Sequence, residues 1–245
     1  MMKLEIYIFS DSQQLPDTLS RDFRRSLEVQ ANAGGSVFVA LSGGSTPRIF
    51  FERLAVPPYR EEIPWKTVHF FWGDERCVPP DDRESNFKMA NDAFLSHVAI
   101  PDNNIHRVMG ENPPQSEVKR YENEIRNHVP LGTRGLPQFD WIFLGMGNDG
   151  HTASLFPGAI TLLEKEALCV IAEHPTSGQK RISLTLPVIN NAKRISFLVT
   201  GAEKATIVRE ILKKSPSSLN YPAAKVKPFN GVLEWYLDTS AAKGL

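Results

Sequence analysis

A histidine that follows a glycine-rich turn is the residue of this chain best suited to proton transfer. The apolar run at 139–144 has about the length of a sheet strand and leads into the segment GMGNDGH at 145–151. Histidine titrates near neutral pH and commonly acts as a general base. Asp149 lies two residues before His151, close enough in sequence to orient the imidazole or to stabilise its charged form. We predict that His151 and Asp149 are catalytic.

The second segment with recognisable chemistry is SGGSTP at 42–47, which follows the apolar run at 36–41. Glycines after a strand let the backbone turn tightly and present N–H groups to an anion. Thr46 followed by Pro47 predicts a helix N-cap and a first helical residue, so the positive end of a helix dipole should face this loop. We predict that the loop binds an anion through Ser42, Gly43, Gly44, Ser45 and Thr46.

Two cationic side chains follow other strand-like runs. Arg76 ends the segment GDER at 73–76, and arginine suits a phosphate or a carboxylate. Lys204 ends the segment GAEK at 201–204 and can reach the same crevice. With the two glycine loops, Arg76 and Lys204 predict an enzyme that binds a small phosphorylated substrate.

The loop at 145–150 also matches the dinucleotide-binding pattern GxGxxG, with Glu173 near the place of a ribose-binding carboxylate. The motif lies in the middle of the chain, however, and Asp149 would lie among phosphate-facing groups. Pro157, Gly158 and Pro175 leave little room for a regular first helix. Nicotinamide binding is therefore the weaker alternative.

The elements that must position these residues alternate between strands and helices. Strands are expected at 3–9, 36–41, 67–72, 139–144, 168–172, 182–186, 195–200 and 232–237. Helices are expected at 15–30, 47–55, 86–98 after a Ser85 cap, after a Ser116 cap, and at 202–212. This alternation predicts an α/β fold with a mainly parallel sheet and helices on both faces. In such sheets ligands bind at the carboxyl ends of the strands, where all the segments above fall.

The composition excludes several classes of partner. Lys plus Arg and Asp plus Glu number 28 each, so the basic excess typical of nucleic-acid binders is missing. No apolar run is long enough to cross a bilayer, and the first residues lack a signal-peptide pattern. Cys77 and Cys169 are far apart, which indicates a reducing cytoplasm and argues against a structural zinc site. No His/Cys/Asp cluster has ligand spacing, so we expect no metal. The other histidines are interpreted as structural or surface residues: His69, His97, His106, His128 and His174.

Five segments resemble, in order, the motifs of the 6-phosphogluconolactonase family. They are LSGGSTP at 41–47, WGDERCVP at 72–79 with SN at 85–86, GMGNDGHTASLFP at 145–157, RISLT at 181–185 and TGAEKA at 200–205. The resemblance extends from about residue 10 to 237, and its third segment is the most specific. Deaminases of the related glucosamine-6-phosphate group follow the histidine with a segment containing Asn-Glu-Pro. Here TASLFP at 152–157 contains no carboxylate, which favours the lactonase.

The resemblance implies a fold of the deaminase/ribose-isomerase type and no metal or organic cofactor. It implies hydrolysis of 6-phospho-D-glucono-1,5-lactone to 6-phosphogluconate, with His151 activating water while Arg76 and Lys204 bind the anionic ends. We expect one lactonase domain over residues 1–245, cytoplasmic, as a monomer or weak homodimer. An isomerase or deaminase on the same scaffold and a non-catalytic sugar-phosphate sensor remain as alternatives.

Overall fold

A six-stranded parallel sheet forms the centre of the computed structural model, which describes residues 2–11 and 13–245. Every neighbouring pair of its strands runs parallel, so the prediction of a mainly parallel sheet is confirmed. In spatial order the strands are β1 (Lys3–Phe9), β9 (Val232–Asp238), β8 (Arg194–Val199), β5 (Trp141–Leu144), β2 (Val37–Leu41) and β3 (Val68–Trp72).

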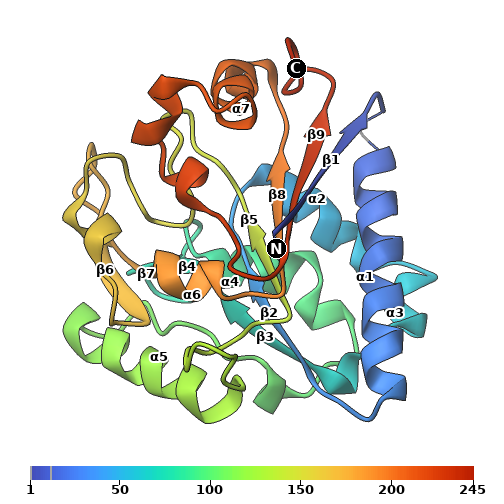
Figure 1. Cartoon of the computed structure of the whole chain (residues 1–245). Helices are drawn as coiled ribbons and strands as arrows, with labels where there is room; N and C mark the ends of the chain where they lie inside the picture. The colour runs from blue at the N-terminus through green and yellow to red at the C-terminus, as the bar shows by residue number, and fades with distance from the viewer. Residues whose placement is uncertain (1, 12) are drawn as a thin grey trace.

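Helices cover both faces of this sheet, which explains why its central strands are continuous apolar runs. Every residue of β2 and β5 is buried. On one face lie α1 (Gln14–Asn32) and α2 (Ser45–Leu54), because Phe23 of α1 packs on Phe50 of α2 and on Phe70 of β3. On the other face lies α5 (Pro114–His128), whose Tyr121 packs on Phe71, the next residue of β3. Figure 1 shows α1 and α5 on opposite sides of the molecule. The remaining α-helices are α3 (Tyr59–Glu62), α4 (Asn86–Ala93), α6 (Leu186–Asn190) and α7 (Ala205–Leu212).

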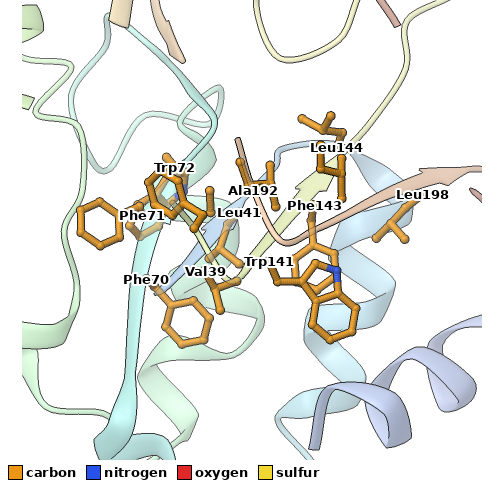
Figure 2. Close-up of a cluster of buried hydrophobic side chains, with 14 of the residues drawn as sticks. Val39, Leu41, Phe70, Phe71, Trp72, Trp141, Phe143, Leu144, Ala192 and Leu198 are labelled. Carbon is orange, nitrogen blue, oxygen red and sulfur yellow. The ribbon is translucent and has the colours of Figure 1, made fainter. Parts of the chain in front are cut away.

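Aromatic side chains form the core between the sheet and the helices. The α1 residue Phe23 packs with its ring 5.7 Å from that of Trp141 on β5 and 5.8 Å from that of Phe50 on α2. Figure 2 shows Val39 on β2 between Phe70 on β3 and Trp141, as their pairing in the sheet requires. This packing holds β2, β3 and β5 side by side, so that their carboxyl ends meet at one edge.

A second, antiparallel sheet differs from the sequence-based expectation. It contains β4 (Asp74–Arg76), β7 (Lys180–Leu184) and β6 (Cys169–Glu173), in that order. The runs at 168–172 and 182–186 are therefore strands, as predicted, but they do not join the parallel sheet. The six residues at 174–179 are too few for a crossover helix, so β6 and β7 pair as a hairpin. The segment at 74–76, expected only as a loop after a strand, is itself a strand.

Three predicted helix ends were wrong. The N-cap residue of α2 is Gly44, with a φ of 111°, and not Thr46 as predicted. The hydroxyl of Thr46 is instead hydrogen-bonded to that of Thr200. Ser116 lies inside α5, which begins at Pro114 because proline suits the first turn of a helix. The helix after Ser85 ends at Ala93, although Ser85 caps it as predicted. Within the described residues, no helix combines the length and apolarity needed to span a membrane.

Candidate active site

A cavity of about 320 Å³ opens at the edge where the strands of the parallel sheet end. The loops after β2, β5 and β8 line it, and so do residues of β4 and β7 in the second sheet. Eight predicted site residues line this cavity: Ser42, Gly43, Gly44, Ser45, Thr46, Arg76, His151 and Lys204. The ninth, Asp149, is not among the lining residues and contacts His151 instead.

The imidazole of His151 is held on one side by Asp149. Its Nδ1 lies 2.6 Å from Asp149 Oδ1, and its backbone N–H donates to the same oxygen at 3.1 Å. Burial raises the pKa of Asp149, but the hydrogen bonds and charge of His151 outweigh it, so the pKa lies below its ordinary value. Because the carboxylate can only accept, the neutral ring carries its hydrogen on Nδ1 and keeps its lone pair on Nε2.

Two glycines make room for this pair. A Cβ on Gly147 would lie 2.1 Å from His151 Nδ1 and 2.7 Å from Asp149 Oδ1, so only glycine fits beneath the ring. Gly150 has a φ of 79°, and a Cβ there would also collide with Tyr221. The glycines of the GxGxxG pattern therefore shape a tight turn around the histidine.

That turn is not followed by the helix that a dinucleotide site requires. The next helical segment is a single 3₁₀ turn at Ile160–Leu163. Glu173 ends β6 of the second sheet, outside the parallel sheet to which a ribose-binding carboxylate would belong. Both observations count against the nicotinamide alternative.

The first glycine loop is cross-linked to its neighbours. Ser42 Oγ accepts from the backbone N–H of Gly145 at 3.2 Å, which joins the two glycine loops. Thr46 Oγ1 lies 2.7 Å from the Oγ1 of Thr200, the residue that follows β8. No side chain caps α2, so its first N–H groups and the positive end of its dipole remain available beside the cavity.

Three cationic side chains line the cavity. Arg76 and Arg181 lie opposite each other on β4 and β7, and Lys204 contacts Asn148 Oδ1. Burial and the neighbouring charge of Arg76 lower the pKa of Arg181, and burial lowers the pKa of Lys204. The buried Nε of Arg76 has no hydrogen-bond partner among the described residues. Clustered, partly desolvated cations of this kind are stabilised when an anion binds between them.

Two buried acidic side chains shape the same region. Asp74 lines the cavity and accepts from the Ser154 hydroxyl at 2.6 Å. Glu75 points away and accepts from the backbone N–H groups of Arg76, Asn86 and Phe87 at 2.7–2.8 Å. Burial raises the pKa of Glu75 to about 6. Glu75 thereby fixes the start of α4 against β4.

Sequence reasoning did not assign six polar residues that line the cavity: Asp74, Asn86, Asn148, Arg181, Thr200 and Glu203. Arg181 begins the RISLT segment, so the family resemblance was the one signal that could have found it. Asn86 packs its amide on Gly43, where a Cβ would lie 2.0 Å from Oδ1. That contact explains the first glycine of the loop, but it joins residues that are far apart in sequence.

One group of potential metal ligands occurs in the described part of the chain, and it lies outside the cavity. It consists of His106, Glu124 and His128. This group was not predicted, because His106 lies 18 residues before Glu124 and shares no local motif with it.

Comparison with known proteins identifies the family. The family model described as glucosamine-6-phosphate isomerases/6-phosphogluconolactonase matches residues 10–235. The chain belongs to this family. A 6-phosphogluconolactonase of Haemophilus influenzae is 48% identical over 235 residues, covering 96% of this chain and 97% of that protein. One of Treponema pallidum is 43% identical, covering 87% and 86% of the two chains.

Solved structures agree with the fold. The crystal structure of a devB protein superposes with a TM-score of 0.90 at 47% identity, covering 99% of this chain and 98% of that one. The 6-phosphogluconolactonase of Trypanosoma brucei gives 0.88 at 28% identity over the full length of both chains. A monomeric glucosamine-6-phosphate deaminase gives 0.81 at 20% identity, covering 97% and 98%, and this likeness supports the deaminase/ribose-isomerase type of fold.

Proposed function

We propose that this protein hydrolyses 6-phospho-D-glucono-1,5-lactone to 6-phosphogluconate, the second step of the oxidative pentose phosphate pathway. The observation that carries the proposal is the His151–Asp149 pair, 2.6 Å apart, at a cavity that also holds three cations. The 6-phosphogluconolactonases related to this chain support the choice of substrate.

In the proposed reaction His151 acts first as a base. Its Nε2 removes a proton from water while the water oxygen bonds to the lactone carbonyl carbon, and the carbonyl oxygen becomes an oxyanion. When the intermediate collapses, the bond to the ring oxygen breaks and His151 returns the proton to that oxygen. Asp149 stabilises the imidazolium between these two steps. General base catalysis of this kind contributes about 10²–10⁴-fold, and an activated ester such as a lactone needs no nucleophilic serine.

The cations and the first glycine loop would bind the anionic groups of the substrate. The open N-terminus of α2 and the side chains of Ser45 and Thr46 suit the phosphate. Arg76, Arg181 and Lys204 would bind either the phosphate or the developing oxyanion. Because the net charge of the chain is zero, attraction of a dianion must come from these local charges.

The proposal is tested by adding purified protein to freshly prepared lactone and following acid release. Wild type should exceed spontaneous hydrolysis, and His151→Gln should lower kcat by about 10²–10⁴-fold with an unchanged melting temperature. A His97→Gln variant, altered at an exposed histidine outside the cavity, is the matched control. A His151→Gln enzyme with more than a third of the wild-type kcat would remove His151 from the mechanism. Ammonia release from glucosamine 6-phosphate would instead favour the deaminase alternative.

Five further properties complete the proposal. Residues 1–245 would act as a single lactonase domain, as a monomer or weak homodimer, in the cytoplasm. Turnover would need neither a metal nor an organic cofactor, and no nucleic acid would bind. Light scattering of the purified chain tests the oligomeric state. A gel-shift assay tests whether nucleic acid binds.

A further inference from the structure

Three histidines and a glutamate gather at the outer edge of the parallel sheet. His69 lies on β3, the last strand of the sheet. His106 lies beside this strand, because its backbone N–H donates to the backbone carbonyl of Phe70 at 2.8 Å. Glu124 and His128 are one turn apart near the end of α5, which places both on the same face of the helix. None of these four residues lines the cavity described above.

The side chains of His106, Glu124 and His128 place their potential metal-ligand atoms close together. The ligand atoms of the three lie within 4.8 Å of one another. His106 Nδ1 is 2.7 Å from Glu124 Oε1, and His128 Nδ1 is 3.6 Å from the same oxygen. Before a metal binds, His128 Nδ1 bonds the backbone carbonyl of Glu124 at 2.9 Å, so it must leave that carbonyl to ligate the ion. Bonds of 2.0–2.2 Å to a tetrahedral zinc ion place its ligand atoms about 3.3 Å apart, so small side-chain rotations suffice.

His69 supports this arrangement from behind. Its Nδ1 lies 3.0 Å from His106 Nε2, on the side of the ring opposite Glu124. Without a metal, His106 Nδ1–H can donate to the Glu124 carboxylate while Nε2 accepts from His69 Nδ1–H. A metal ion bound at His106 Nδ1 favours the other tautomer, in which Nε2–H donates to His69 Nδ1. Metal-binding histidines characteristically donate their second ring N–H in this way, which fixes the tautomer.

We propose that His106, Glu124 and His128 bind a zinc ion, with His69 as the residue that positions His106. Two histidines and one carboxylate are a donor set that zinc accepts in proteins. The side chain of His106 is 3% exposed and that of His128 is 36% exposed, so the ion would enter from solvent and keep a water as its fourth ligand. Bound there, it would join the end of α5 to the edge of the sheet.

One nearby cation could oppose this site. Arg120 Nη1 lies 3.5 Å from Glu124 Oε2. Arg120, however, donates from Nε and Nη2 to the buried Glu117 at 2.6–3.0 Å. These bonds hold the guanidinium on the Oε2 side of the Glu124 carboxylate. Glu124 Oε1 therefore stays directed at the two histidines.

Zinc chloride titrated into metal-free protein against a fluorescent zinc indicator tests the proposal. Wild type should bind one zinc ion per chain, and zinc should raise its melting temperature. His128→Gln should weaken binding at least tenfold, and His69→Phe, which keeps a ring but no acceptor, by about 10–100-fold. His97→Gln is the matched control, because His97 is also an exposed histidine that bonds a backbone carbonyl, that of Asp92. It should bind as wild type does.

The cavity histidine separates this site from adventitious binding near the proposed active site. His151→Gln should leave zinc affinity and stoichiometry unchanged. The proposal would be overturned if His151→Gln lost zinc binding or if His128→Gln bound zinc as tightly as wild type. It would also be overturned if wild type did not compete with the indicator for zinc. All these readouts are binding or melting measurements, so they do not depend on lactonase activity.

Discussion

The smallest change expected to disable the proposed base is a single methyl group on Gly147. A Cβ there would lie 2.1 Å from His151 Nδ1 and 2.2 Å from Cε1. Ordinary contacts of a Cβ begin at about 3.4 Å, so the imidazole must move by at least an ångström. The same Cβ would lie 2.7 Å from Asp149 Oδ1, so the ring and its partner carboxylate must separate or move together.

The expected loss can be worked from that displacement. A catalytic group misplaced by about 1 Å costs on the order of 10²-fold in rate, which corresponds to a barrier raised by about 2.7 kcal/mol. The backbone of Gly147 does not have a positive φ, so alanine is compatible with the turn. Gly147→Ala should therefore lower kcat about 100-fold, with a much smaller change in melting temperature and in KM.

Steady-state kinetics on fresh lactone, with thermal unfolding of the same samples, would measure both effects. Gly145→Ala is the matched control in the same loop, because its Cβ would meet nothing closer than Ser42 Oγ at 3.6 Å. It should retain most of the wild-type kcat. If Gly147→Ala also retained it while folding normally, the position of the His151 ring would not matter to the reaction, and the general-base assignment would fail.

Three other changes test separate parts of the site. Arg76→Ala and Lys204→Ala should each lower kcat/KM on the phosphorylated lactone by about 1.5–3 kcal/mol, roughly ten- to a hundredfold. The loss should be much smaller on unphosphorylated gluconolactone for whichever residue binds the phosphate, and equal losses on both substrates would reject that role. Exhaustive chelation should leave lactonase activity intact, and activity restored only by added metal would refute the metal-free mechanism. The pKa of Glu75 is about 6 in the fold and 4.5 in the unfolded chain, so the folded state binds the proton more tightly. Its contribution to stability is therefore complete below pH 4.5 and is lost as the pH rises through 6. The difference in unfolding free energy between wild type and Glu75→Gln should fall by about 2 kcal/mol over that range in urea titrations, and a rise would contradict the sign.

The parallel sheet and most of its site could be predicted because both depend on local patterns. Fully buried strands such as β2 and β5 are unbroken apolar runs, and a glycine loop directly follows each of them. Parallel strands share one carboxyl edge, so loops placed there must converge even when more than a hundred residues separate them. That argument brought His151, Arg76 and Lys204 to one cavity without any knowledge of the packing.

What could not be predicted depends on contacts between distant segments. The pairing of β4 with β7, which sets Arg181 beside Arg76, has no local signature in either strand. The start of α2 was misjudged because Thr46 uses its hydroxyl to reach Thr200 and leaves the cap position to Gly44. The histidine cluster at the sheet edge was missed for the same reason, since its members come from three separate segments.

Asp149 lies outside the cavity lining, and this position matters because charges of both signs develop in the proposed reaction. Negative charge develops on the lactone carbonyl while positive charge develops on His151, so the site must stabilise opposite charges a few ångströms apart. Arg181 and Arg76 line the cavity, whereas Asp149 contacts the Nδ1 side of the ring and is absent from the lining. Asp74 and Glu203 already line the cavity, so a third carboxylate there would add to the repulsion of the phosphate and the oxyanion. From behind the imidazole, Asp149 would stabilise the cation that the proposed mechanism forms on His151, and the ring would separate the carboxylate from the substrate.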